Sequence, residues 1–189
     1  MVEGSATGDG TVAAAAAFAN LAALHAKVDA KFADIAARHP DQVNCRRGCH
    51  SCCLPNLTVV GVEAARIRQY FVDHPDALAA ARTNARDKPH GATRCAMLDV
   101  DGGCVIYPVR PTLCRAHGAP ALVSKPSGPQ LDVCPLNFTN IKLETLPDDR
   151  IGVDHLNTLL FLTGELWQPG TSRKRVRLTL RGLGISMRG

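Results

Sequence analysis

The residues with the clearest chemical potential are eight cysteines. Four of them lie within residues 45–53, where short gaps let several thiolates converge from one tight loop on a single centre. Gly48 allows such a loop to turn sharply. The other four are spaced so widely that only the tertiary fold can bring them to the first group. We therefore predict a metal site with ligands drawn from Cys45, Cys49, Cys52, Cys53, Cys95, Cys104, Cys114 and Cys134.

The type of ligand limits the metal. Thiolates are soft and select zinc, copper(I) or iron–sulfur clusters, whereas magnesium and calcium prefer carboxylate and carbonyl oxygens. A tetrahedral zinc ion or a cubane cluster uses four ligands, so the cysteines either serve two centres or include residues that bind no metal. Cys52 and Cys53 are adjacent, so we expect their side chains to point different ways and to be able to serve different centres.

The expected redox compartment favours metal ligands over disulfides. The first ten residues carry Glu3 and Asp9 but no Lys or Arg, unlike the basic start of a secretory signal. The alanine run that follows leads into charged residues, and no stretch is expected to reach the roughly 20 apolar residues of a membrane span. We predict a cytoplasmic protein with no membrane partner and with reduced thiols. The alternatives are four disulfides in an exported protein, or unrelated buried cysteines.

Four helices are expected to position the cysteines. Apolar residues at three- and four-residue steps predict helices over 12–38, 62–74, 76–87 and 154–167. Short apolar runs broken by Gly and Pro over 89–135 predict loops and a short hairpin. The predicted fold class is mainly α, a small single domain with an irregular Cys/Pro/Gly-rich metal-binding half. Its expected segments are a disordered N-terminus over 1–11, a cysteine-cluster domain over 12–170, and a basic C-terminal tail or edge strand over 171–189.

The charge pattern does not favour nucleic acid as a partner. The formal net charge is only +5, and the aromatic share of 4% is low for a protein that stacks single-stranded bases. The tail alternates apolar residues such as Val176 and Leu178 with basic ones, which is also typical of an exposed edge strand. The basic residues of the tail are Arg173, Lys174, Arg175, Arg177, Arg181 and Arg188.

The cysteine motifs resemble those of the YkgJ-like cysteine-cluster family, also called CxxCxxCC proteins. The run from Cys45 to Cys53 is similar to the family's first motif, and the segment 62–65 that follows resembles its Glu-Ala helix. Cys95 falls where the family places another cysteine. The family's second motif is similar to Cys104-Val-Ile-Tyr107-Pro-Val-Arg110-Pro111-Thr-Leu-Cys114-Arg115.

This resemblance implies binding of zinc, iron or an iron–sulfur cluster. It also makes a peptide- or protein-modifying enzyme conceivable, because flagellin lysine N-methylase has a similar cysteine motif. This chain is much shorter and lacks a Gly-rich nucleotide-binding loop after a strand, so we do not predict methyltransferase activity for it. The spacing of Cys45, Cys49 and Cys52 also matches radical S-adenosylmethionine enzymes, but a predicted helix precedes it and the chain is too short for the usual barrel.

Four further residues have a functional and a structural interpretation. His50 and His117 lie near cysteines and could be mixed ligands or proton shuttles, although the supply of thiolates favours a role outside the metal site. Tyr107 and Arg110 could orient a substrate, or they could pack and brace their loop. The structural interpretation is favoured for all four.

The sequence therefore gives two functional hypotheses. In the first, the cysteines hold iron or an iron–sulfur cluster, and the protein is a redox protein or an iron-dependent oxidoreductase or peptide-modifying enzyme with a peptide or protein substrate. In the second, they hold structural zinc, and the protein acts as a binding or interaction module. Folding and metal binding should be coupled in both.

Overall fold

The computed structural model of the chain describes residues 7–87 and 93–187. The part of the predicted N-terminal disorder that falls on residues 1–6 lies outside these ranges, as does Arg188 in the basic tail. Helices and two small sheets make up the described chain, which confirms a small, mainly helical domain. Short 3-10 turns lie at Pro40–Gln42, Tyr107–Val109 and Leu143–Thr145.

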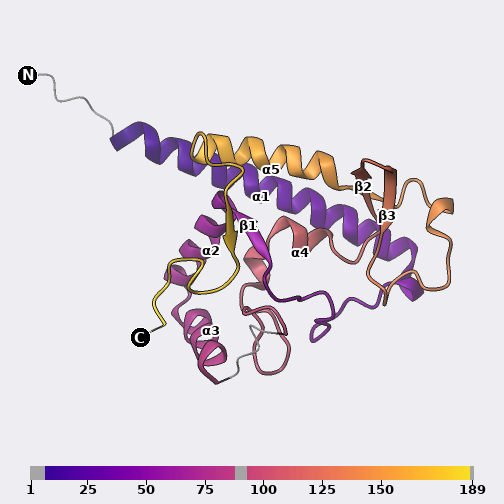
Figure 1. Cartoon of the computed structure of the whole chain (residues 1–189), viewed down its shortest axis with the longest axis horizontal. Helices are drawn as coiled ribbons and strands as arrows, with labels where there is room; N and C mark the ends of the chain where they lie inside the picture. The colour runs from indigo at the N-terminus through magenta and orange to yellow at the C-terminus, as the bar shows by residue number, and fades with distance from the viewer. Residues whose placement is uncertain (1–6, 88–92, 188–189) are drawn as a thin grey trace, which may run out of the picture.

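Two helices run side by side along the length of the molecule (Figure 1). They are α1 (Thr7–Arg38) and α5 (Val153–Trp167). Small and branched apolar residues at helical spacing form the buried stripe of α1, and α5 and α4 (Thr112–Ala116) cover it. The helix was predicted over 12–38. In the structure it ends at Arg38 as predicted but begins earlier, at Thr7. The stripe contains Ala17, Leu21, Leu24, Val28 and Ile35.

The hydropathy of α1 differs from expectation. Its residues 11–38 are long and apolar enough to cross a membrane by length and composition, although we predicted no such stretch from the sequence. Alanines rather than large apolar residues account for much of the apolar character of α1. The core helix of a soluble protein and an N-terminal signal sequence can both have this length and composition. In the structure, α1 contacts α2 (Gly61–Asp73), α4 and α5.

A second core lies beneath α2 and α3 (Pro75–Asp87). The observed bounds of both helices are close to the predicted ranges 62–74 and 76–87. The C-terminal tail contributes to it through β5 (Arg175–Arg177), which pairs antiparallel with β1 (Thr58–Val60). Leu178, Leu180 and Leu183 after β5 are buried against this core. The tail is thus a strand at a sheet edge whose leucines are part of the folded domain.

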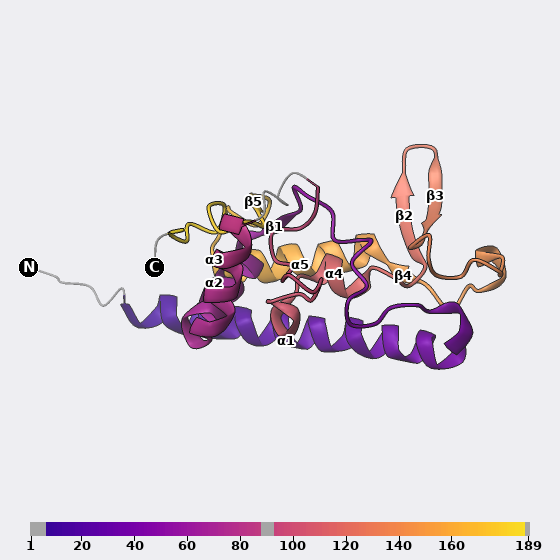
Figure 2. The same ribbon diagram turned by 90° about the horizontal axis from the view of Figure 1, so that it is seen from below.

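The predicted short hairpin is present and projects from the body of the molecule (Figure 2). Its strands are β2 (Ala121–Lys125) and β3 (Gly128–Asp132), and β2 also pairs in parallel with β4 (Ile151–Gly152) just before α5. The sheet order is β3-β2-β4. This sheet connects the segment after α4 to α5.

Candidate metal centre

The first cysteine loop turns where glycine permits it. Gly48 has a φ of +84°, a conformation that residues with a Cβ rarely adopt. The Cys49 N–H donates to the Arg46 carbonyl at 2.9 Å, and the Cys53 N–H donates to the His50 carbonyl at 2.9 Å. Two consecutive tight turns thus carry the four cysteines of residues 45–53, as their spacing predicted.

This loop is bound to the segment that carries the next two cysteines. The Cys95 N–H donates to the Cys53 carbonyl at 2.9 Å. Arg94 donates to His50 Nε2 at 3.1 Å, and the His50 ring packs so closely on Gly102 that a Cβ there would lie 2.6 Å from its Cδ2. These contacts bring residues 45–53 and 93–104 together, and they give His50 a structural role in the described chain.

The segment from Cys95 to Cys104 is a compact turn. Leu98 and Cys104 form an isolated antiparallel bridge, and the Val105 N–H donates to the Met97 carbonyl at 2.9 Å. The Asp99 carboxylate caps the turn by accepting from the Gly103 N–H at 2.6 Å. The two thiols at either end of the turn are thereby held near one another.

Asn137 holds a second pair of cysteine segments together. Its buried amide nitrogen donates to Cys45 Sγ at 3.4 Å and to the Gly118 carbonyl at 2.7 Å. Its backbone N–H donates to the Cys134 carbonyl at 2.9 Å. Gly118 has a φ of +112°, and a Cβ there would lie 2.8 Å from Cys45 Sγ. Sequence reasoning missed Asn137 and Gly118, because a single Asn or Gly among many gives no signal of such a contact.

A buried polar network sets the position of α4 and therefore of Cys114. Glu63 at the start of α2 is 4% exposed and accepts from the backbone N–H of Val60 at 3.3 Å and of Thr112 at 2.8 Å. The Thr112 hydroxyl is 3.1 Å from Nε2 of the buried His25 on α1. Glu63 thus joins the starts of α2 and α4. The resemblance had marked this residue only as part of a helix.

Burial raises the pKa of Cys45, and negative charge on Cys49, Cys134 or Cys52 raises it further; we call Cys45, Cys49 and Cys134 the Cys45 group. Burial likewise raises the pKa of Cys114, and negative charge on Cys95, Cys104, Glu63 or Cys52 adds to the shift; we call Cys114, Cys95 and Cys104 the Cys114 group. The charge of Cys52 acts on members of both groups. All eight cysteines are described and none is in a disulfide.

Residues 44–135 match the family model CxxCxxCC, described as a "putative zinc- or iron-chelating domain". These 92 of the 189 residues are similar to that domain, and we call residues 44–135 the CxxCxxCC domain. The match confirms the resemblance drawn from the cysteine motifs and covers all eight cysteines. The curated proteins and the solved structures that were compared gave no match.

The pKa is raised above its ordinary value for five of the thiols of the CxxCxxCC domain, those of Cys45, Cys52, Cys95, Cys104 and Cys114. Burial raises the pKa of Cys104 to about 11 and that of Cys114 to about 12, and neighbouring cysteines add to both shifts. The pKa of Cys52 is raised mainly by a hydrogen bond between its thiol and that of Cys53. These two side chains therefore meet, contrary to the expectation that they point different ways. Arg110 opposes the shift at Cys104.

The donor set of the CxxCxxCC domain fits zinc or iron in chemical type. Eight thiols in two groups can supply the soft ligands that both metals accept. Among the residues that the structure describes, however, no three Cys, His, Asp or Glu side chains converge closely enough to hold one ion. The assignment of the eight cysteines as ligands therefore stays a prediction, and binding would require the thiols to move closer together.

Arg110 and Arg115 of the second motif brace the CxxCxxCC domain against α1. Arg110 forms an ion pair of 2.9 Å with Asp29, and the buried Arg115 pairs with the same carboxylate. The Arg110 guanidinium also lies 4.1 Å from the centre of the Tyr107 ring. These contacts support the structural interpretation of Arg110 and Tyr107. Arg115 also donates to the carbonyls of Pro108 and Arg110, so it ties α4 to the segment before it.

Raising the pH should destabilise the metal-free protein. Above the ordinary thiol pKa of 9.0 the unfolded chain releases protons that folded Cys104 and Cys114 retain up to about 11 and 12. Their contribution is thus fully present below pH 9.0 and is lost as the pH rises toward those values, at up to about 1.4 kcal/mol per pH unit for each thiol. Urea unfolding of the reduced protein across this range measures the slope. The Cys104→Ser/Cys114→Ser variant should show a shallower slope, and an equal slope would contradict the assignment.

Proposed function

We propose that the CxxCxxCC domain binds iron or zinc through cysteine thiolates in two neighbouring centres. The observation that carries this proposal is that hydrogen bonds join the segments that carry the cysteines. The Cys95 N–H donates to the Cys53 carbonyl, and Asn137 donates both to Cys45 Sγ and to the Cys134 carbonyl. Unrelated buried cysteines would not be expected to collect in this way. The description of the family supports metal binding and leaves zinc and iron as the two metals.

The grouping suggests how the ligands are divided. The Cys45 group and the Cys114 group each supply three thiols, while a four-coordinate centre needs one more. Negative charge on Cys52 adds to the pKa shifts of Cys45, Cys95 and Cys114, and the adjacent Cys53 accepts a backbone hydrogen bond from Cys95. In this proposal each of the adjacent pair completes one centre. Their mutual hydrogen bond is lost when they deprotonate to bind metal.

For the identity of the metal, we favour iron or an iron–sulfur cluster, which would supply one-electron redox chemistry when bound. The exposure of Cys45 and the partial exposure of Cys49 support a centre that a partner or substrate can reach. Asn137 would hold the Cys45 sulfur by a hydrogen bond, and Arg110 would lower the cost of thiolate charge at Cys104. Structural zinc in a binding module is the alternative.

We extend the proposal to location and partner. Eight cysteines without a disulfide suit a reducing cytoplasm, and an exposed edge of the Cys45 group suits a peptide or protein substrate. We propose neither a membrane nor a nucleic-acid partner. Fractionation of cells that produce the full chain tests the location, and recovery in the membrane fraction would overturn it.

Metal and acid-labile sulfide analysis of protein purified without oxygen tests the proposed function. We expect Cys49→Ser and Cys114→Ser each to lose roughly half of the metal, because each removes a ligand from a different centre. Arg47→Lys, an exposed change in the first cysteine loop that keeps the positive charge, is the matched control and should lose none. Iron with matching sulfide supports a cluster, and zinc without sulfide supports the alternative. Metal-free protein that takes up neither ion would overturn the proposal.

A further inference from the structure

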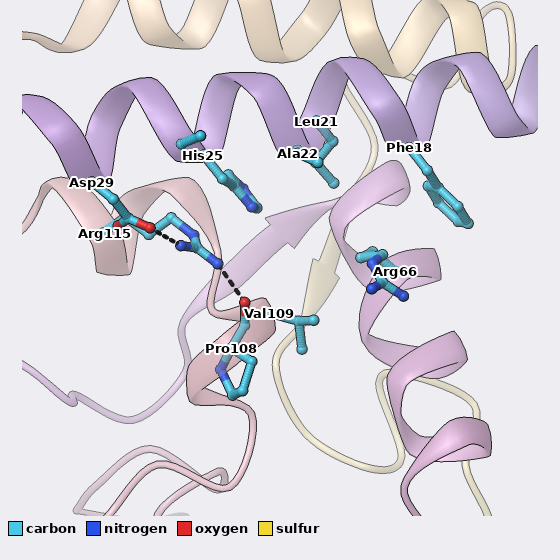
Figure 3. Close-up of a pocket in the computed structure, with 10 residues that line it drawn as sticks. Phe18, Leu21, Ala22, His25, Asp29, Arg66, Pro108, Val109 and Arg115 are labelled. Carbon is cyan, nitrogen blue, oxygen red and sulfur yellow. Dashed lines mark hydrogen bonds and ion pairs between the residues drawn. The ribbon is translucent and has the colours of Figure 1, made fainter.

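A pocket of about 250 Å³ lies between α1, α2 and the segment that leads from Cys104 to Cys114 (Figure 3). No cysteine is among the described residues that line it. One part of its wall is apolar and comes mostly from α1. This part contains Phe18, Leu21, Ala22, Pro108 and Val109.

Two buried polar side chains in the wall are already bound within the protein. His25 contacts the Thr112 hydroxyl through Nε2 at 3.1 Å. Arg115 donates to the carbonyls of Pro108 at 2.7 Å and Arg110 at 2.9 Å, and it pairs with Asp29. Both side chains belong to residues that are 7% exposed. These bonds hold both side chains in place. Because Arg110 and Arg115 share the single Asp29 carboxylate, this side of the pocket is also positively charged.

Arg66 on α2 is different. Figure 3 shows it on the α2 side of the pocket, opposite Asp29 and Arg115. Within residues 7–87 and 93–187, no hydrogen bond or ion pair satisfies its guanidinium. Asp29, the only acidic residue among the described lining, is occupied by Arg110 and Arg115. The pocket therefore combines an apolar wall with a guanidinium that has no described partner, beside two further guanidiniums that share one carboxylate.

We propose that this pocket binds a small organic carboxylate. The carboxylate pairs with the Arg66 guanidinium, whose planar fork matches it in two parallel hydrogen bonds. The apolar part of the ligand lies against Phe18, Leu21 and Val109. The volume is slightly below the roughly 300–1,000 Å³ typical of drug-sized ligands, so an acid with one ring or a short chain fits best. This inference goes beyond metal binding, because it uses none of the thiols.

Calorimetric titration of the full chain with three probes tests the ligand class. Benzoate carries both the ring and the carboxylate, benzamide keeps the ring without the charge, and inorganic phosphate keeps negative charge without the ring. We expect benzoate to bind at least about tenfold more tightly than either of the others, because only benzoate uses both halves of the pocket. Equal binding of benzamide or phosphate, or no binding of benzoate, would overturn the proposal.

Variants locate the binding site. Arg66→Gln should weaken benzoate binding by about tenfold, since it removes the charged partner. Arg68→Gln on the same helix, outside the pocket lining, is the matched control and should leave affinity unchanged. Ala22→Leu fills the pocket from an exposed position of α1 without changing charge, and it should also weaken binding. Thermal unfolding confirms that each variant is folded. Unchanged affinity in Arg66→Gln and Ala22→Leu would overturn the site, whatever metal the protein contains.

Discussion

Glu63→Ala is expected to lower the free energy of unfolding by about 2–5 kcal/mol. The substitution removes the carboxylate that accepts from the backbone N–H groups of Val60 and Thr112, and it leaves both buried without a partner. It also removes the acidic neighbour of His25, whose Nε2 lies 3.9 Å from Glu63 Oε1. Urea unfolding of the purified protein measures the loss.

Two variants sharpen this test. Glu63→Gln keeps one acceptor oxygen, so its loss should be smaller than that of Glu63→Ala. Glu144→Ala removes an exposed carboxylate and should change stability by no more than about 0.5 kcal/mol. If Glu63→Ala were as mild as Glu144→Ala, the network would not join α2 to α4 as described.

Removal of the proposed metal is expected to lower the free energy of unfolding by as much as Glu63→Ala does, or by more. At a free metal concentration a thousandfold above the dissociation constant, binding contributes about 4 kcal/mol to stability, and a chelator abolishes that contribution. The loss should be concentrated in residues 45–57 and 93–106, where the structure places turns and loops rather than regular helices or paired strands. Hydrogen exchange before and after anaerobic chelation measures it residue by residue.

Readdition of metal provides the control for chelation. Iron or zinc should restore protection from exchange in both segments, while magnesium should not, because it prefers oxygen ligands. The core cluster that joins α1 and α5 contains no cysteine among its described residues, so these two helices should lose less protection. If hydrogen-exchange rates in these segments were the same before and after metal removal, the metal would have no role in folding.

The parts of the fold that could be predicted are those with a local signal. The helix expected over 62–74 is observed as α2 at Gly61–Asp73, because its apolar stripe and the proline after His74 are both visible in the sequence. The edge strand of the tail was also visible from its alternation. Its partner β1 was not, since a strand of three residues gives no reliable pattern and the pairing joins residues far apart.

The site shows the same limit. Residue type and spacing were enough to identify the cysteine cluster and its family, but they could not divide the thiols into groups. That division depends on single contacts such as Asn137 with Cys45, and on the meeting of Cys52 and Cys53. The unpaired Arg66 was equally invisible, because its significance lies in the absence of a described acidic partner rather than in its position in the sequence.

The Asn137 contact has a consequence for biosynthesis. It joins residues 92 positions apart, so the ribosome presents Cys45 long before the side chain that holds its sulfur exists. At about 5–20 residues per second, the first cysteine loop waits roughly 5–20 s for its partners. During that interval its thiols are open to oxidation and to the wrong metal. Under the proposed function, metal therefore binds the Cys45 group only late in synthesis, and these thiols must stay reduced until then.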